Sequence, residues 1–296
     1  MKKILLTGKN GQVGWELQRT LAPLGQVMAL DAAGLDLTNP DAIRQTVRSI
    51  QPDIIVNPAA YTAVDRAESE PELAMAVNGI APGILAEEAR KLDALLVHYT
   101  TDYVFDGRKD SPYVETDAPN PLSVYGKTKL AGEQAIRATG ANHLIFRTSW
   151  VYGMRGKNFL LTMLRLAKER SELRIVDDQI GAPTWSRSLA ETSALVLAQL
   201  CAPGADREAI ERVAGTYHLT SSGSVSWYGF AAEILRLSKV QPMPRLLPIT
   251  TPEYPTPAAR PMNSVLLNDK LIRTFGLAAG DWDSNLRLCM QEVHGF

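Results

Sequence analysis

Tyr125 and Lys129 stand four residues apart, in a stretch that follows a loop ending at Ser123. If this stretch is helical, both side chains lie on one face and can act on one bound molecule. A free phenol has a pKa of about 10, and a neighbouring cation favours the phenolate and lowers that pKa toward the range of a useful acid-base catalyst. The pair predicts a proton donor and its tuning group. With nine tyrosines in the chain, an exposed helix face is the alternative.

Three glycines follow the first predicted strand, residues 4–6. They are Gly8, Gly11 and Gly14, and a helical pattern of apolar residues continues to residue 24. In the order strand, glycine-rich turn and helix, backbone N–H groups and the positive helix end can bind a pyrophosphate. The glycines therefore predict a dinucleotide site, and a simple strand-to-helix turn is the alternative.

Asp31 ends the second predicted strand, residues 27–30, seventeen positions after Gly14. An acidic side chain there can bond the adenosine ribose and repel a 2′-phosphate, which favours NADH. Lys9, inside the glycine loop, weakens this preference for NADH. The sequence therefore does not decide between NADH and NADPH as the cofactor.

Further buried strands are predicted at 53–57, 94–99 and 144–148, separated by helical patterns. This alternation predicts an α/β fold, a doubly wound parallel (Rossmann-like) sheet whose ligands bind beyond the carboxyl ends of the strands. Thr101 and Asp102 fall at such an end. Tyr125 follows Thr101 by twenty-four residues.

The glycine spacing, with Thr7 before the first glycine, and the later Tyr-x-x-x-Lys resemble the extended branch of the short-chain dehydrogenase/reductase superfamily. The resemblance implies that Thr101 bonds the substrate carbonyl. Tyr103 stands where the sugar-nucleotide dehydratases carry a glutamate, which argues against dehydration, whereas epimerisation stays open.

Over nearly its whole length the chain resembles the dTDP-4-dehydrorhamnose reductases. The resemblance rests on segments at 11–14, 101–105, 125–133, 146–153, 178–184 and 254–261. It implies NAD(P)H-dependent reduction of the C4 ketone of dTDP-4-dehydro-L-rhamnose, the last step of dTDP-L-rhamnose synthesis for cell-surface polysaccharide. Two alternatives are a non-catalytic NAD(P)-binding regulatory subunit and a sugar-nucleotide epimerase of the same fold.

The same resemblance assigns site residues. The catalytic residues it implies are Thr101, Tyr125 and Lys129. Those expected to touch the cofactor are Gly8, Gly11, Gln12, Val13, Gly14, Asp31, Asp36, Leu37, Ala60, Tyr61, Thr62, Tyr99 and Lys129. Those expected to touch the substrate are Thr101, Asp102, Tyr125 and Trp150. Arg260, at the end of a proline-rich segment, is a separate candidate for the diphosphate because a guanidinium pairs bidentately with phosphate, and a surface arginine in a loop is the alternative. Glu16 is a candidate ligand of a dimer-associated Mg²⁺, its partners unknown, and a homodimer is expected.

Two regions are predicted along the chain. Residues 1–150 form the dinucleotide-binding domain, and residues 151–296 form mainly a smaller substrate-binding domain. The stretch 173–200 is expected to return to the sheet of the first domain, so that the two domains interleave.

Composition excludes several other classes of protein. The net charge of −1 gives no reason to expect nucleic acid or an anionic membrane surface as a partner. Cys201 and Cys289 are the only cysteines, which fits a reducing compartment. The N-terminal apolar run is too short for a signal peptide and no run is long enough to span a bilayer, so we expect a cytoplasmic protein without membrane contact.

Overall fold

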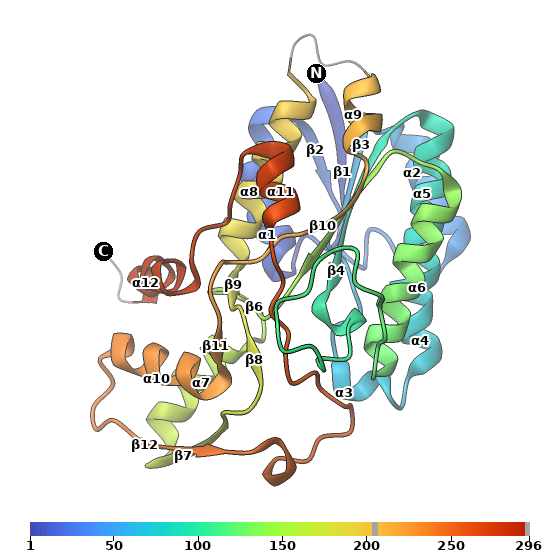
Figure 1. Cartoon of the computed structure of the whole chain (residues 1–296). Helices are drawn as coiled ribbons and strands as arrows, with labels where there is room; N and C mark the ends of the chain where they lie inside the picture. The colour runs from blue at the N-terminus through green and yellow to red at the C-terminus, as the bar shows by residue number, and fades with distance from the viewer. Residues whose placement is uncertain (203–206, 294–296) are drawn as a thin grey trace.

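The structure, a computed structural model, describes residues 1–202 and 207–293. Six strands form one parallel sheet in the order β10-β5-β4-β3-β1-β2 (Figure 1). They are β1 (Lys2–Leu6), β2 (Gly25–Ala29), β3 (Ile54–Asn57), β4 (Leu95–Thr101), β5 (His143–Thr148) and β10 (Gly215–His218). The predicted doubly wound sheet is confirmed, and the sequence patterns missed only its sixth strand, β10.

Helices cover both faces of this sheet, which explains why its strands are almost continuous apolar runs. One face packs against α1 (Gln12–Thr20), α8 (Ser186–Leu200) and α11 (Asp269–Phe275). The other face packs against α2 (Pro40–Ile50), α5 (Ala81–Leu92) and α6 (Val124–Thr139) (Figure 1). The chain order reverses between β1 and β3, so the carboxyl ends of these two strands open the crevice in which such sheets bind ligands.

The helical segment that leads from the loop after β3 to β4 is interrupted. It runs as α4 (Pro71–Met75), a π-helical segment η2 (Ala76–Ile80) and α5, and α3 (Val64–Ala67) precedes it. The Asn78 side chain leaves η2, accepts from the Tyr61 N–H at 2.9 Å and donates to the Tyr61 carbonyl at 3.0 Å. This helical irregularity therefore fixes the loop after β3, as π-bulges often do at functional sites.

A smaller lobe with its own apolar core lies beyond one end of the sheet (Figure 1). Its helices are α7 (Phe159–Glu169), α10 (Trp227–Ser238) and α12 (Trp282–Val293). Its strands pair two by two: β6 (Val151–Tyr152) with β9 (Thr184–Trp185), β8 (Ile180–Gly181) with β11 (Val225–Ser226), and β7 (Glu172–Val176) with β12 (Arg245–Ile249). The short helix α9 (Arg207–Val213) precedes β10 instead.

The two halves of the stretch 173–200 belong to different lobes. β7 does not join the large sheet, because its partner β12 comes from much later in the chain and holds it in the smaller lobe. In contrast, α8 packs on α1 and contributes Leu189 and Leu197 to the core of the large sheet. The expected return is therefore wrong for 173–176, and the segments that cross back are α8, β10 and α11.

Among the described residues, no helix is both long and apolar enough to cross a membrane.

Candidate functional site

A cleft of about 790 Å³ lies at the carboxyl ends of β1 to β5. It brings together most residues that the sequence singled out. Those that line it are Gly8, Gly11, Gln12, Val13, Gly14, Asp31, Asp36, Leu37, Ala60, Thr62, Tyr99, Thr101, Asp102, Tyr125, Lys129 and Trp150. Segments far apart in the chain therefore meet in one hollow large enough for extended ligands.

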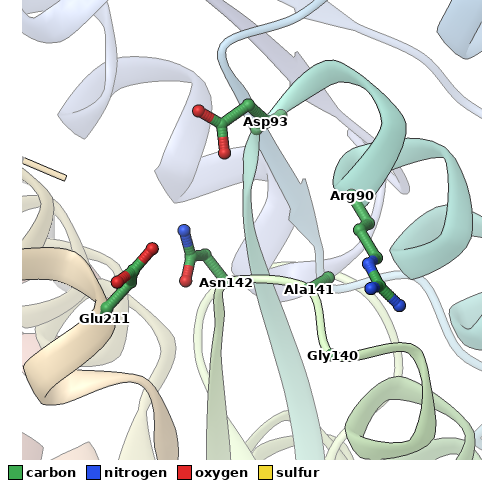
Figure 2. A pocket seen from close by; sticks show the side chains of 7 residues that line it. Arg90, Asp93, Gly140, Ala141, Asn142 and Glu211 are labelled. Carbon is green, nitrogen blue, oxygen red and sulfur yellow. The ribbon is translucent and has the colours of Figure 1, made fainter. Parts of the chain in front are cut away.

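A second, smaller hollow of about 260 Å³ lies at the opposite end of the sheet, where β4 and β5 begin (Figure 2). Arg90 there donates to the carbonyl of Thr139. The hollow contains none of the predicted site residues, and its side chains mix Arg90 with the carboxylates of Asp93 and Glu211. It therefore adds nothing to the chemistry of the first cleft.

The glycine loop forms the floor of the large cleft. Gly8 has φ +60°, which favours glycine, and a side chain on Gly14 would place its Cβ 2.1 Å from the Gly8 carbonyl oxygen. Gly11 precedes α1 without capping it by a side chain, which leaves the first backbone N–H groups of the helix available to an anion. These features fit the pyrophosphate of a dinucleotide.

Asp31 stands beyond β2 as a carboxylate held by the backbone. It accepts from the N–H of Gly34 at 3.1 Å and from the amide of Asn10 at 3.0 Å, and Lys9 Nζ lies 3.5 Å away. The hydrogen bond from Gly34, followed by the charge of Lys9, holds the pKa of Asp31 below its ordinary value. Asp31, which favours NADH, and Lys9, which weakens that preference, are therefore neighbours.

Tyr125 opens α6, whose first turn is fixed from two sides. Ser123 caps the helix by accepting from the N–H of Gly126 at 3.2 Å. Gly126 has no side chain because a Cβ would lie 2.2 Å from the Tyr103 carbonyl oxygen, and the Tyr103 ring packs edge-on against Tyr125 at 5.5 Å. The phenol is thereby directed into the cleft.

Lys129 lies one turn further along α6 and is buried. Its ammonium donates to the Tyr99 carbonyl at 2.7 Å, while the Tyr99 hydroxyl bonds Ser193 at 2.7 Å on α8. Burial lowers the pKa of Lys129 to about 8. The lysine is therefore charged at neutral pH and loses its charge in mildly alkaline solution.

The pKa of Tyr125 moves opposite to the direction predicted from Lys129 alone. Burial raises it to about 12, a hydrogen bond with Thr101 lowers it, and the charge of Asp102 raises it. The predicted net lowering is wrong for this chain by itself, because removal from water outweighs the other effects. Tyr125 is consequently protonated at neutral pH, which is the state required of a proton donor.

Thr101 and Asp102 form a buried pair beside Tyr125. The Thr101 hydroxyl donates to Asp102 Oδ1 at 2.9 Å and accepts from the Tyr103 N–H at 3.2 Å. Burial raises the pKa of Asp102 to about 6, and its Oδ2 has no hydrogen-bond partner among the described residues. This arrangement offers a hydroxyl and a free carboxyl oxygen to a polar ligand.

Trp150 forms a wall of the cleft in an unusual backbone conformation. Its φ is +48°, and its ring stacks on Trp227 at 3.5 Å with an interplanar angle of 7°. A side chain on Gly181 would collide with the indole at 2.4 Å, so the ring is enclosed on two sides. Sequence reasoning missed Trp227, which lies at the start of α10 and carries no motif of its own.

Three predicted residues, Tyr61, Arg260 and Glu16, lie outside the cleft lining. Tyr61 turns its hydroxyl to Glu70, and only its backbone is fixed near the site by Asn78. Arg260 forms a bidentate pair with Asp65 at 3.0 and 2.8 Å, so its charge is already compensated.

Glu16 lies elsewhere, 3.4 Å from Arg187, which also pairs with Glu292. The described residues contain no cluster of three or more His, Cys, Asp or Glu side chains arranged for a metal ion. Since the Glu16 carboxylate is already paired with a guanidinium, the residues of a single chain do not fit a Mg²⁺ site.

Three features together define a nicotinamide-dependent oxidoreductase of the short-chain dehydrogenase/reductase superfamily. They are the glycine loop after the first strand, Asp31 after the second strand, and a protonated tyrosine one turn before a buried lysine. The family model for the RmlD substrate binding domain matches residues 1–294. The chain belongs to the dTDP-4-dehydrorhamnose reductase family.

Individual relatives cover nearly the whole chain. It is 50% identical to a dTDP-4-dehydrorhamnose reductase of Burkholderia thailandensis, over 98% of this chain and 99% of that protein. The corresponding enzyme of Escherichia coli K12 is 49% identical, over 98% and 97%.

Solved structures support the same family assignment. One from Clostridium acetobutylicum superposes with a TM-score of 0.90 at 39% identity, over 99% of this chain and 100% of that one. A reductase of Bacillus anthracis in complex with NADP superposes with a TM-score of 0.88 at 37% identity, over 98% and 99%. A UDP-glucose 4-epimerase of Thermus thermophilus shares the fold alone, at 18% identity.

Proposed function

We propose that this chain is an NAD(P)H-dependent reductase that converts the C4 ketone of dTDP-4-dehydro-L-rhamnose to the alcohol of dTDP-L-rhamnose, the last step of dTDP-rhamnose synthesis for cell-surface polysaccharide. The observation that carries the proposal is the convergence of Thr101, Tyr125 and Lys129 in the cleft floored by the glycine loop. Family membership supplies the identity of the sugar.

The reduced nicotinamide, when bound, supplies the hydride that C4 accepts. Tyr125 donates its phenolic proton to the oxygen that becomes an alkoxide, which its high pKa permits because an alkoxide is a much stronger base. Thr101 donates a hydrogen bond to the same oxygen once its hydroxyl proton turns away from Asp102 Oδ1. The charge of Lys129 stabilises the phenolate that Tyr125 leaves behind.

The proposed binding roles are assigned from the positions of the residues in and beside the cleft. We propose that the glycine loop, Gln12 and Val13 hold the pyrophosphate, that Asp31 holds the adenosine ribose, and that Asp102 and Trp150 contact the sugar. The other proposed cofactor contacts are Asp36, Leu37, Ala60, Tyr61 through its backbone, Thr62 and Tyr99. Arg260 is kept as a proposed diphosphate partner because a guanidinium pairs bidentately with phosphate, for which it would have to leave or share Asp65.

The assembly and location are proposals from the family resemblance. We propose a homodimer that works in the cytoplasm, and both cysteines are free thiols. A dimer-bound Mg²⁺ at Glu16 would have to displace Arg187, so no catalytic role is given to it.

The function is tested by mixing the purified chain with NADH or NADPH and dTDP-4-dehydro-L-rhamnose while following the absorbance of the reduced nicotinamide. We expect one equivalent oxidised for each sugar nucleotide supplied. A regulatory subunit would oxidise none, and an epimerase would recycle its cofactor without net oxidation.

Thr101→Val should lower turnover on the order of 10²-fold, because it removes a hydrogen-bond donor aimed at the developing oxyanion while keeping the side-chain shape. Thr100→Val is the matched control, since the Thr100 hydroxyl is buried and has no hydrogen-bond partner among the described residues. Steady-state rates of both variants check this, and equal rates would remove Thr101 from the role.

Lys9→Met should lower the preference for NADPH over NADH by roughly fivefold at low salt, since an exposed charge interaction is worth up to about 1 kcal/mol. The lysine is the cation beside Asp31 that can balance a 2′-phosphate. Lys2→Met, which removes a similar exposed pair with Asp53, serves as the control. The ratio of kcat/KM for the two cofactors measures the effect, and an unchanged ratio contradicts it.

A further inference from the structure

A loop of the smaller lobe, residues 153–157 between β6 and α7, lies against the first turn of α1. Asn158 Nδ2 donates to Gln12 Oε1 at 2.8 Å and to the Gly153 carbonyl at 2.8 Å. Gln12 Nε2 in turn donates to the Val151 carbonyl at 3.4 Å. The smaller lobe is therefore bonded to the first residue of α1, which belongs to the proposed pyrophosphate site.

Two further contacts hold the loop in the same place. The Arg155 guanidinium lies over the ring of Trp15 on α1, 3.3 Å from its centroid. Gly156 has φ +73°, and a Cβ on it would lie 3.5 Å from Gln12 Cγ, so its backbone passes next to that side chain. The backbone on both sides of Lys157 is therefore fixed near Gln12.

Lys157 is an exposed cation that lines the large cleft. Its ammonium stands on a flexible four-carbon stem. With the residues that the structure describes, it forms neither an ion pair nor a hydrogen bond. Lys157 is therefore available to an anionic ligand beside the glycine loop.

The lining of the cleft offers little other positive charge. It carries the carboxylates of Asp31, Asp36 and Asp102. The other cation among the described lining residues is Lys129, which is buried and donates to a backbone carbonyl of β4. A dinucleotide carries a negative charge on each phosphate, whereas the glycine loop provides neutral N–H groups and the partial charge of one helix end. A cation at Lys157 would complete the compensation of that charge.

We propose that Lys157 binds the pyrophosphate of the nicotinamide cofactor beside the N–H groups of the glycine loop, and that Asn158 is a positioning residue that holds Lys157 there through Gln12. The pyrophosphate is then bound from both lobes, since α1 packs on the large sheet and the loop belongs to the smaller lobe. The identity of the ligand rests on the dinucleotide site of the proposed function, whereas the contacts of the loop do not.

The substrate diphosphate is the other anion expected in the cleft. Phe159, two residues after Lys157, packs against Trp227 with ring centroids 4.6 Å apart, so the loop also borders the wall formed by the stacked tryptophans. The cofactor is favoured because both chain neighbours of Lys157 lie against Gln12. The experiment therefore measures binding of each anion separately.

Lys157→Met removes the charge and keeps an unbranched side chain. We expect the Kd values of NADH and NADPH to rise by the same factor, about fivefold at low salt, because the two cofactors share the pyrophosphate. The Kd of dTDP, the probe for the substrate site, should stay within about twofold of wild type. Fluorescence of the reduced cofactors and calorimetry with dTDP measure these values.

Lys168→Met is the matched control, because Lys168 is an exposed lysine on α7 of the same lobe, outside the cleft lining. It should leave all three Kd values unchanged. Lys157→Arg keeps the charge and should bind both cofactors within about twofold of wild type. In about 1 M salt the difference between Lys157→Met and wild type should fall below about twofold, because the interaction is screened.

Three results would overturn the proposal. Equal cofactor affinity in Lys157→Met and wild type would remove Lys157 from the site. A loss for NADPH alone would place its charge at the 2′-phosphate, and a loss for dTDP as large as that for the cofactors would place it at the substrate diphosphate. A wild type that binds cofactor without turning over the sugar nucleotide would count against the proposed function alone.

Asn158→Ser tests the positioning role. Serine is also a good helix cap, so the bond from the Leu161 N–H that begins α7 can be kept, but its side chain is too short to donate to Gln12. In this background Lys157→Met should raise the cofactor Kd by less than about twofold, because the lysine is no longer held at the pyrophosphate. The same cost in both backgrounds would overturn the role of Asn158. Thermal melts establish that each variant is folded, and the variants of Lys157 decide its role even if Asn158→Ser does not fold.

Discussion

Tyr125→Phe should lose turnover by at least about 10²-fold and up to about 10⁴-fold, the usual worth of a positioned acid-base group. The phenol is the protonated group that faces the cleft, and its removal leaves the forming alkoxide without a proton donor. Binding of NADPH, followed by fluorescence, should change by less than about twofold, because the proposed pyrophosphate site is the glycine loop and not Tyr125.

Tyr103→Phe is the control for that experiment. Tyr103 packs edge-on against Tyr125 in the same cleft, so the variant also deletes one phenolic hydroxyl from a neighbouring ring. We expect it to retain turnover within about tenfold of wild type. Near-normal turnover in Tyr125→Phe would remove Tyr125 from the proton-donor role.

Gly14→Ala should weaken binding of the reduced cofactor at least tenfold, a loss of about 1.4 kcal/mol or more. The new Cβ would meet the Gly8 carbonyl oxygen at 2.1 Å, a backbone atom, so the loop itself has to move. A displacement of this size also moves the first N–H groups of α1 away from the pyrophosphate.

Gly11→Ala provides the graded comparison, because its Cβ would meet that same oxygen at 3.3 Å, which a small shift relieves. Titration calorimetry with NADPH measures both variants, and thermal melts establish that each is folded. Equal affinity for Gly14→Ala and wild type would show that the loop is not the pyrophosphate site.

The sheet and the cleft were predictable because their signals are local. A short apolar strand, the glycines, Asp31 and Thr101 each lie within a few residues of the element end that places them, and parallel strands carry their carboxyl ends to the same edge. The Tyr-x-x-x-Lys spacing predicted that Tyr125 and Lys129 lie on one face of a helix.

The remaining features depend on contacts between distant segments. Trp227 reaches Trp150 only because the smaller lobe folds back onto the sheet, and His98 reaches Lys129 across the interior. Neither contact leaves a pattern in the local sequence. Arg260 shows the converse, since its motif is local but Asp65, nearly two hundred residues earlier, binds its guanidinium.

The pKa of Tyr125 illustrates a third limit. A neighbouring cation in the sequence predicted its lowering, yet the extent of burial, which raises it, is set by the packing of Tyr103 and the loop before α6. Sequence spacing thus identified the pair, whereas the balance between desolvation and charge required the folded chain.

The most direct measurement of the proposed reaction is the transfer of isotope from the cofactor to the sugar. NADPH carrying deuterium at the transferable position of the nicotinamide is incubated with the chain and dTDP-4-dehydro-L-rhamnose, and the product is examined by NMR and mass spectrometry. A reductase that delivers hydride to the C4 ketone gives dTDP-L-rhamnose with one deuterium at C4. A product without deuterium, or deuterium at another carbon, would contradict the account.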